Sequence, residues 1–384
     1  FRSERYLLVD GRAAPDAWDK VAGIYRCGDG GWIRLHTNFP HHRDGILALL
    51  GCRHERAAVQ QALDRRGALE FEEEAVGAGM VVAALRSFAE WDAHPQGKAV
   101  ADLPLVAIER LGEAPASPLP PAGRPLSGLQ VLDLTRIIAG PVCGRCLAAH
   151  GADVLLVTGP HLPAIETLVI DTGRGKRSTR LDLRQAPDQE RLRRLLAGAD
   201  IFVQGYRPGA LAARGFGPEE AARIRPGIVY VSLSAYGHEG PWSGRRGFDS
   251  LVQTASGFND AEAGAAGTDV PKALPAQALD HAAGYLMAFG AMTALARRAR
   301  EGGSWHVRVS LARTGQWLRS LGRLEGGFTT PDPSAEDVED LLEEAPSGFG
   351  RLRAVRHAAI LSETRAGWTR PSVPLGTHSP AWAD

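Results

Sequence analysis

The carboxylate that stands out in the sequence is Asp280, because of the segment that it opens. Residues 279–298 form a long, mostly apolar stretch, and their spacing predicts a helix. A carboxylate in the first turn of a helix is stabilised by the helix dipole, so a capping role would account for Asp280 on composition alone. The spacing therefore marks this position and leaves its role open.

A second group with chemical potential is the basic segment 173–178, which reads Gly-Arg-Gly-Lys-Arg-Ser. Cationic side chains beside glycines hold phosphates through charge and close backbone approach. Lys176 and Arg177 are therefore candidate phosphate ligands in a flexible turn. A solvated loop fits the same residues equally well.

Cys143 and Cys146 form a C-x-x-C pair where a helix is expected to begin. A helix N-terminus lowers the pKa of a thiol, which is how redox sites with this spacing work. No small thioredoxin-like domain surrounds the pair, and zinc would need about four ligands where only His150 lies nearby in sequence. We therefore expect structural cysteines and no metal site.

Three histidines, His36, His41 and His42, gather around Pro40, with Asp44 as the only further candidate ligand beside them. This spacing matches no metal motif. We expect surface histidines near the start of a helix.

The segments that position these residues alternate between strands and helices. Strand-like runs lie at 129–134, 154–157, 201–203, 228–231 and 305–311, and helical segments at 139–150, 189–196, 218–224 and 279–298. This alternation predicts an α/β fold with a Rossmann-like, doubly wound parallel sheet. No G-x-G-x-x-G follows Leu134, which disfavours a nicotinamide or flavin cofactor, but a ligand at the carboxyl ends of the strands is still expected.

A smaller α+β lobe is predicted ahead of this sheet. It has a strand at 31–35 and helical spacing at 46–50, 57–63 and 81–91, and five prolines in 113–125 indicate a semi-rigid linker after it. The predicted division is an N-terminal remnant (1–19), the small lobe (20–112), the linker (113–127), the large domain (128–325) and a C-terminal tail packed on the body (326–384). Within the tail, residues 336–344 are an acidic helix candidate.

The charge balance disfavours some partners. Lys plus Arg and Asp plus Glu both number 44, whereas nucleic acids and anionic membranes attract proteins with a positive field. No apolar run approaches the ~20 residues of a membrane-spanning helix. Four cysteines without a disulfide-rich framework predict a cytoplasmic protein, and the missing initiator Met suggests a trimmed N-terminus.

Taken in order, these segments resemble the family III CoA-transferases, which include formyl-CoA and carnitine CoA-transferases. Residues 128–136 with Ala139-Gly140-Pro141 resemble the family's first strand and CoA loop, and 175–183 resemble its basic turn. Residues 199–209 resemble the next strand and loop. Residues 237–241 and 247–249 are similar to a later pattern, and Asp280 falls at the family's catalytic aspartate. The resemblance extends from about residue 128 to residue 317.

The resemblance implies that CoA moves from an acyl-CoA donor to a carboxylic acid acceptor in covalent steps on Asp280. It implies no permanently bound cofactor and an interlaced homodimer. Backbone N–H groups near Gly140 or at the Asp280 helix would stabilise developing oxyanions. The CoA-binding residues that it implies are Ile137, Ile138, Ala139, Lys176, Arg177, Gly205, Tyr206 and Arg214.

The chain departs from the family pattern in two places. The small lobe precedes the large domain, which resembles the second half of a duplicated or fused transferase. Ala213 stands where the family often has an arginine, with Arg214 one position later.

Two alternative functions stay open. An acyl-CoA racemase of this fold would carry a histidine where the chain has Phe248, unless His281 or His238 substitutes for it. A catalytically silent CoA-binding protein would keep the fold without the chemistry.

Overall fold

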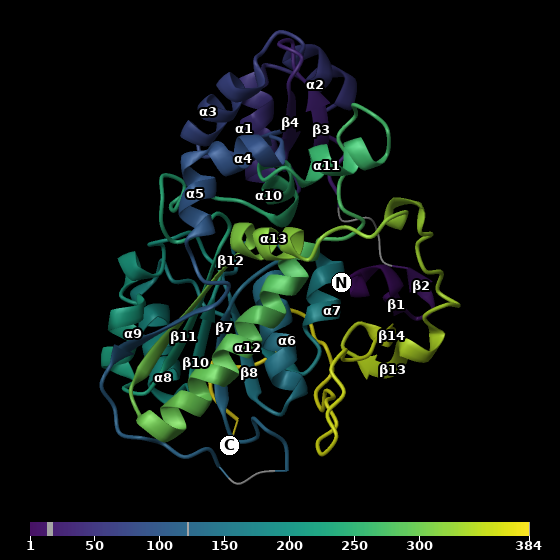
Figure 1. Ribbon diagram of the computed structural model, residues 1–384. Helices are drawn as coiled ribbons and strands as arrows, with labels where there is room; N and C mark the ends of the chain where they lie inside the picture. Colours follow the sequence, from purple (N-terminus) through teal and green to yellow (C-terminus); the bar gives the residue numbers. More distant parts are fainter. Residues whose placement is uncertain (14–17, 121–122, 384) are drawn as a thin grey trace.

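A seven-stranded sheet lies at the centre of the computed structural model (Figure 1). Residues 1–13, 18–120 and 123–383 are described; residues 14–17 of the predicted remnant, 121–122 of the predicted linker and 384 of the predicted tail lie outside them. The strand order is β6-β12-β11-β10-β7-β8-β9, with all pairs parallel except β6 and β12. The strands are β6 (Ala107–Gly112), β7 (Gln130–Leu134), β8 (Asp153–Thr158), β9 (Lys176–Arg180), β10 (Ile201–Gln204), β11 (Val229–Ser234) and β12 (Ser304–Ser310).

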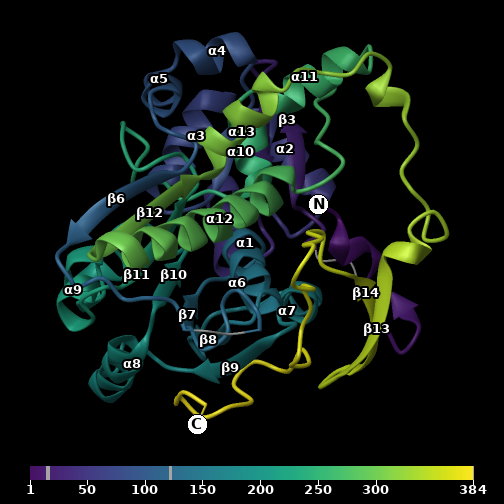
Figure 2. The same cartoon turned by 60° about the horizontal axis from the view of Figure 1, so that its bottom comes forward.

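This order confirms the predicted Rossmann-like, doubly wound sheet, because the strands proceed outward from β7 first in one direction and then in the other. Alternate side chains point to opposite faces. Val131 and Val203 share a core with α6 and α12, whereas Leu132 and Phe202 share one with α8 and α9 (Figure 2). The helices of this domain are α6 (Ala139–Ala149), α7 (Glu166–Thr172), α8 (Ala186–Gly198), α9 (Pro218–Ile224), α10 (Asp249–Ala255), α11 (Phe258–Ala265), α12 (Ala278–Glu301), α13 (Leu311–Ser320) and the 3₁₀ turn η2 (Ala212–Arg214).

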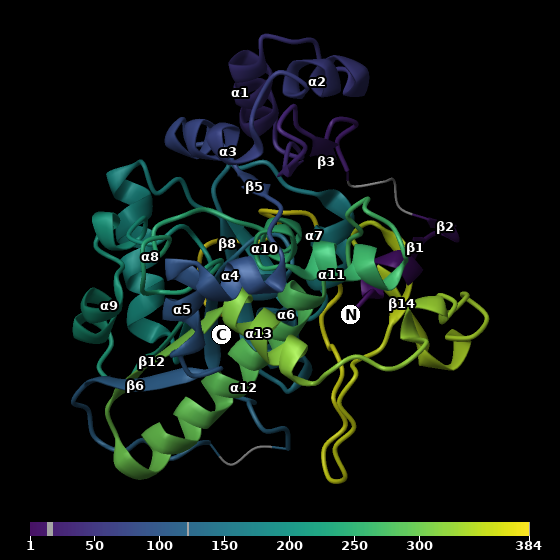
Figure 3. The same cartoon turned by 45° about the horizontal axis from the view of Figure 1, so that its top comes forward.

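The predicted small α+β lobe is confirmed as a three-stranded antiparallel sheet with helices around it (Figure 3). Its elements are β3 (Gly23–Arg26), β4 (Trp32–Leu35), β5 (Val82–Ala84), α1 (Pro40–Leu50), α2 (Arg56–Leu63), α3 (Ala68–Gly77), α4 (Phe88–Ala93) and α5 (Pro95–Ala101). The helical prediction for 81–91 is wrong, because β5 occupies its first part and α4 begins only after Ser87, whose side chain caps that helix together with Glu90.

A third sheet joins segments from near the two chain ends, in the order β13-β14-β1-β2 (Figure 1). It consists of β1 (Leu8–Val9), β2 (Arg12–Ala13), β13 (Leu342–Ser347) and β14 (Gly350–Val355), with the 3₁₀ turns η1 (Ser3–Tyr6), η3 (Gly327–Thr329) and η4 (Glu339–Leu341) nearby in the chain. The acidic helix predicted at 336–344 is therefore wrong. Its last three residues, 342–344, belong to β13 and pair with β14, so tertiary pairing overrides the local helical preference.

The remaining C-terminal segment runs along the large domain. The indole N–H of Trp368 donates to the carbonyl of Arg145 at 3.0 Å, and Ser372 is fully buried. No helix that the structure describes is long and apolar enough to cross a membrane.

Candidate active site

The loops after β7 and β10 meet at the carboxyl edge of the sheet, where the strand order reverses. This switch point is where doubly wound sheets bind ligands. Ile137, in the first loop, has a φ of 75°, a left-handed conformation that a β-branched residue rarely adopts. Such strain persists only where the surrounding structure holds it, and it is concentrated at functional sites. Gly205 and Tyr206, in the second loop, line the same cavity as Ile137.

Two glycines let α6 and α12 approach each other closely beside these loops. A Cβ on Gly284 of α12 would lie 2.5 Å from the carbonyl oxygen of Ala139, at the start of α6. A Cβ on Gly140 would lie 2.4 Å from the Cβ of Thr135 in the loop after β7. Both separations are shorter than atoms tolerate, so larger residues would displace the helices. The glycines thus bring the start of α6 close to the first turns of α12.

Asp280 lies in the first turn of α12 and is buried, with 7% of its surface exposed. Its backbone N–H donates to Oδ2 of Asp249, the first residue of α10, at 2.9 Å. The side chain of Gln253 donates to the other oxygen of Asp249. Asp249 therefore satisfies an N–H at the start of α12, which is the role that Asp280 would have if it were only a cap.

The two carboxyl groups differ in how their charge is supported. Burial, together with the neighbouring charges of Asp249 and Glu4, raises the pKa of Asp280 well above its usual value. Burial raises the pKa of Asp249 to about 6, although the N–H groups that it accepts favour its ionised form. A proton shared by the pair therefore resides on Asp280.

Asp280 lines a chamber of about 360 Å³ that both lobes build. The small lobe contributes Phe39, His41 and His42, and the large domain contributes the loops after β7 and β10 together with a segment ahead of α10. The predicted CoA-binding residues that line this chamber are Ile137, Ile138, Ala139, Gly205 and Tyr206.

Four arginines, Arg136, Arg207, Arg245 and Arg246, line the chamber and give it a positive character. Arg136 donates to the carbonyl of Pro163 and packs over the ring of Phe39, and Arg246 donates to the carbonyl of Gly79 at 3.3 Å. Within the described chain, neither has an ion-pair partner. Arg245 pairs with a glutamate of the small lobe. Unneutralised guanidinium groups that line the same chamber as the carboxyl group of Asp280 favour anionic substrates.

A groove of about 650 Å³ adjoins the chamber and shares Tyr206, Arg207 and Pro208 with it. Its lining includes Arg184 and the predicted residue Arg214. Arg214 donates to the carbonyl of Leu183 at 2.8 Å, so its guanidinium group lies at the end of β9 and its following turn. The groove is therefore suited to the phosphates of a ligand whose reactive end reaches the chamber.

Lys176 and Arg177 do not line the chamber or the groove. The flexible basic turn predicted for them is wrong, because both residues belong to β9. The ammonium group of Lys176 is buried between Oδ2 of Asp133 and the carbonyl of Pro141, at 2.8 Å from each. Arg177 donates to the carbonyl of Ala381 at 2.9 Å. Because neither cation lines the chamber or the groove, their contact with CoA stays a prediction that this geometry does not support.

The histidine cluster of the small lobe is not a surface feature, contrary to the prediction. His36 and His42 are buried, whereas His41 is exposed at the start of α1. The ring of His36 stacks on Phe248 with 3.8 Å between centroids. Burial lowers the pKa of both His36 and His42 to about 3, so both rings are neutral.

The two histidines considered as racemase bases do not line the chamber. Nε2 of His281 lies 3.2 Å from a carboxylate oxygen of Glu4. His238 is largely buried, and burial lowers its pKa to about 4.

Both C-x-x-C cysteines are buried within α6. Burial raises the pKa of Cys143 well above its usual value and that of Cys146 to about 11. A redox-active thiol needs a lowered pKa, so neither thiol has this activation.

Three residues in or beside the chamber are not predicted as site residues from the sequence. Arg136 and His42 line the chamber, and Asp249 accepts a hydrogen bond from the backbone of Asp280. The sequence places Arg136 in the first loop, Asp249 in a family-like pattern and His42 among the surface histidines. The sequence marks Asp249 only by its position at the start of a helix. Its hydrogen-bond partner, the backbone N–H of Asp280, lies 31 positions later and is not evident from the local sequence.

The chain is similar in sequence to known CoA-transferases. The sequence model of CoA-transferase family III matches residues 126–325. The chain is 32% identical to an acyl-CoA transferase of Gibberella moniliformis over 79% of its own length and 60% of that relative. It is 38% identical to the acetyl-coenzyme A transferase nodX of Hypoxylon pulicicidum over 54% of its length and 35% of that relative. It thus spans less than two thirds of either protein.

The fold also matches a solved structure. The crystal structure of Rv3272 from Mycobacterium tuberculosis superposes with a TM-score of 0.59 at 23% identity, covering 68% of this chain and 99% of that one. At this identity the likeness concerns the fold.

Proposed function

Since the chain belongs to CoA-transferase family III, we propose that it moves CoA between an acyl-CoA and a carboxylic acid through covalent intermediates on Asp280. The observation that carries the proposal is the position of Asp280. It lines a chamber that opens into an arginine-bearing groove at the switch point of the sheet. The groove is suited to the CoA phosphates, and the chamber to the thioester and the acceptor acid.

The proposed transfer proceeds in four covalent steps. The Asp280 carboxylate attacks the thioester carbonyl, an O–C bond forms, the C–S bond breaks, and a mixed anhydride and CoA thiolate result. The thiolate attacks the aspartyl carbonyl, which releases the donor acid and leaves an aspartyl-CoA thioester. The acceptor carboxylate then attacks the aspartyl-CoA thioester, which forms a second mixed anhydride and releases CoA thiolate. The thiolate attacks the acyl carbonyl of the acceptor, which gives the new acyl-CoA and regenerates the Asp280 carboxylate. Covalent catalysis divides one difficult transfer into easier ones.

The chamber residues support this sequence of steps. Arg136 and Arg246 would hold the carboxylate of the acceptor or the departing donor acid. Each attack develops negative charge on a carbonyl oxygen. Backbone N–H groups near Gly140 would stabilise that charge without moving.

The test replaces Asp280 with asparagine, which keeps the shape and removes the nucleophile. With an active acyl-CoA and acid pair, chosen by product mass spectrometry, we expect Asp280→Asn to lose at least ~10³-fold in kcat, or ~4 kcal/mol. Hydroxylamine added during turnover should convert the wild-type carboxylate to a hydroxamate in the peptide that contains Asp280. Asp260→Asn is the matched control, because Asp260 also occupies the third position of a helix, α11, outside the chamber. An active Asp280→Asn protein without a trapped adduct would contradict the proposal.

A second candidate, acyl-CoA racemisation, has one observation in its favour. His42 lines the same chamber as Asp280, so a base and an acid face one substrate. The low pKa of His42, about 3, makes it a weak base. Exchange of the α-proton of an acyl-CoA in deuterated water, lost in His42→Gln, would favour this candidate. CoA binding without transfer, exchange or an adduct would instead indicate a silent CoA-binding protein.

A further inference from the structure

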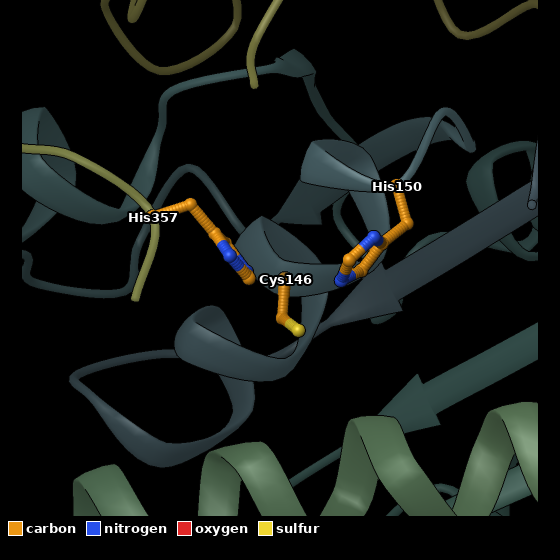
Figure 4. Close-up of side chains that lie close together, drawn as sticks. All are labelled: Cys146, His150 and His357. Carbon is orange, nitrogen blue, oxygen red and sulfur yellow. The ribbon is translucent and has the colours of Figure 1, made fainter. Parts of the chain in front are cut away.

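Three side chains that commonly bind metals meet at the end of α6, away from the chamber (Figure 4). Cys146 and His150 lie four positions apart, so they share one face of the helix end. His357 arrives from the C-terminal segment, just after β14. One ligand atom from each residue lies within 4.8 Å of the other two, and the side chains of both histidines point toward Cys146.

We infer that Cys146, His150 and His357 form a binding site for Zn²⁺. One thiolate and two imidazoles are the donors that this ion prefers, and no carboxylate belongs to the described cluster, which disfavours Mg²⁺ and Ca²⁺. Bonds of about 2.0–2.3 Å at tetrahedral angles place ligand atoms roughly 3.3–3.8 Å apart. The cluster therefore has to contract by about an ångström, with water as the fourth ligand.

An independent observation also points to a ligand at this place. Nε2 of His357 is buried and has no hydrogen-bond partner among the described residues. A buried polar atom without a partner destabilises a protein, and a bound cation would satisfy it. The residues after His357 are exposed, so its ring can approach the other two and the site is accessible from solvent.

One hydrogen bond has to change when the ion binds. The N–H of Ala359 donates to Nδ1 of His357 at 3.1 Å, so the neutral ring carries its proton on Nε2. Coordination through Nε2 requires the proton on Nδ1 instead. Ala359 is exposed, so its N–H can turn to water.

The charges around the cluster act in both directions. Arg124 donates to the carbonyls of Ala148 and Ala149, and Arg145 pairs with Asp171 at 2.6 Å. These cations oppose a divalent ion, but they also favour neutral imidazoles, which are the form that binds metal. Cys146 releases its thiol proton to solvent as the S–Zn bond forms, and the resulting thiolate offsets part of the positive charge.

The bound ion would fasten the C-terminal segment to α6. The helix α6 begins at the chamber and ends at this cluster. The zinc site therefore lies at the opposite end of α6 from the chamber and takes no part in the transfer chemistry. This inference departs from the expectation of structural cysteines alone. A spacing argument finds His150 beside Cys146 but cannot place His357.

The test uses the full chain after treatment with a chelator, with Zn²⁺ and Co²⁺ as probes. Wild type should bind about one Zn²⁺ per chain by elemental analysis, show a thiolate-to-cobalt charge-transfer band in the near ultraviolet, and melt at a higher temperature with zinc. Cys146→Ser and His357→Ala should each weaken zinc binding about 100-fold or more and abolish or shift the band. Cys143→Ser is the matched control, because Cys143 is the other buried cysteine of the pair and lies outside the cluster.

His357→Ala guards against a folding artefact, since His357 lies on an exposed segment and its loss should leave the circular dichroism spectrum unchanged. A wild-type protein without stoichiometric zinc and without the cobalt band would overturn the inference. Undiminished zinc binding by folded His357→Ala would overturn it as well. Transferase activity is measured separately, so neither result bears on the proposed function.

Discussion

The carboxyl group of Asp280 must be ionised to attack a thioester, yet its surroundings favour the protonated form. Burial and the nearby Asp249 raise its pKa, so the unliganded protein holds a proton at the position where the proposed mechanism needs a nucleophile. A raised pKa also makes the carboxylate more nucleophilic once it is ionised. The proposed function therefore predicts transfer rates that rise with pH across the titration of this pair.

The same pKa predicts how stability depends on pH. An acid whose pKa is higher in the folded state contributes stability below its unfolded pKa of ~4 and loses it as pH rises through the folded value. Asparagine does not titrate, so Asp280→Asn removes this decrease of stability with rising pH. The melting temperature of the variant relative to wild type should therefore be higher at about pH 8 than at about pH 5, as measured by calorimetry.

The exposed Asp260→Asn variant serves as the comparison and should show a much smaller change with pH. A relative stability of Asp280→Asn that does not vary with pH would mean that Asp280 titrates normally in the fold. Such a result would also remove the expected rise of the transfer rate with pH.

Individual residues show the limit of reading a sequence. Asp280 could be singled out because it begins a long apolar helix, which is local information. Lys176 is a cationic residue beside glycines, as many phosphate ligands are. However, Asp133, 43 positions earlier, neutralises its ammonium group inside the sheet. His42 lines the chamber because the small lobe folds over the large domain. Neither fact is present in the nearby sequence.

At the scale of elements, the close packing of α6 on α12 determines where Asp280 lies. Gly284→Ala adds a Cβ that would lie 2.5 Å from the carbonyl of Ala139. The helices must separate, which should destabilise the protein by about 1–3 kcal/mol. Because the loop after β7 and Asp280 would also separate, the proposed function predicts that kcat falls more than the affinity for CoA, as measured by steady-state kinetics and calorimetry.

Gly264→Ala, in α11, is the matched control. It is the same substitution in a helix, but a Cβ at this position meets nothing within 4 Å. It should be neutral or stabilise the helix by up to ~1 kcal/mol. Equal effects of both substitutions on kcat would show that helix separation does not govern catalysis.

The elements that the sequence predicted best are those whose patterns are local and long. Five of the six parallel strands and α9 lie where the sequence predicts them, and α12 extends only slightly beyond its predicted range, whereas β9 lies where a turn is predicted. The helical predictions for 81–91 and 336–344 fail because contacts with distant parts of the chain, and not the local sequence, determine the structure there. Residues 81–84 are buried on both faces, so their spacing carries no period, and β13 exists because β14 pairs with it.

At the scale of the whole molecule, a buried ion pair joins the small lobe to the large domain. Glu72 of α3 pairs with Arg86 at 2.6 Å and with Arg245 of the large domain at 2.8 Å. The N–H of Arg86 also donates to the carbonyl of Thr254 in α10 at 3.2 Å. These contacts lie within one chain, so a single chain assembles the chamber from both lobes. The homodimer that the resemblance implies stays a prediction.

Glu72→Gln should therefore uncouple the lobes. It leaves two buried guanidinium groups without a neutralising carboxylate, which should reduce the free energy of unfolding by about 3 kcal/mol. The small lobe should also become more sensitive to proteases, while CoA should restore part of the stability by binding across both lobes. The measurements are denaturant unfolding and limited proteolysis with and without CoA.

The exposed neighbour Glu73, changed to glutamine, is the matched control and should behave as wild type. If Glu72→Gln unfolds at the wild-type denaturant concentration, the ion pair does not join the lobes.

The sheet formed by β1, β2, β13 and β14 has a consequence for synthesis of the protein. Leu8 pairs with Arg353, so this part of the fold cannot close until residue 353 has left the ribosome. Pairing partners this far apart form slowly, because a large loop must close before any contact compensates for its entropy. Until then, Leu7, which is buried against Leu352 and Ala354, remains exposed. Nascent chains released before β14 should therefore bind chaperones through the segment around Leu7, whereas the parallel sheet can already be complete.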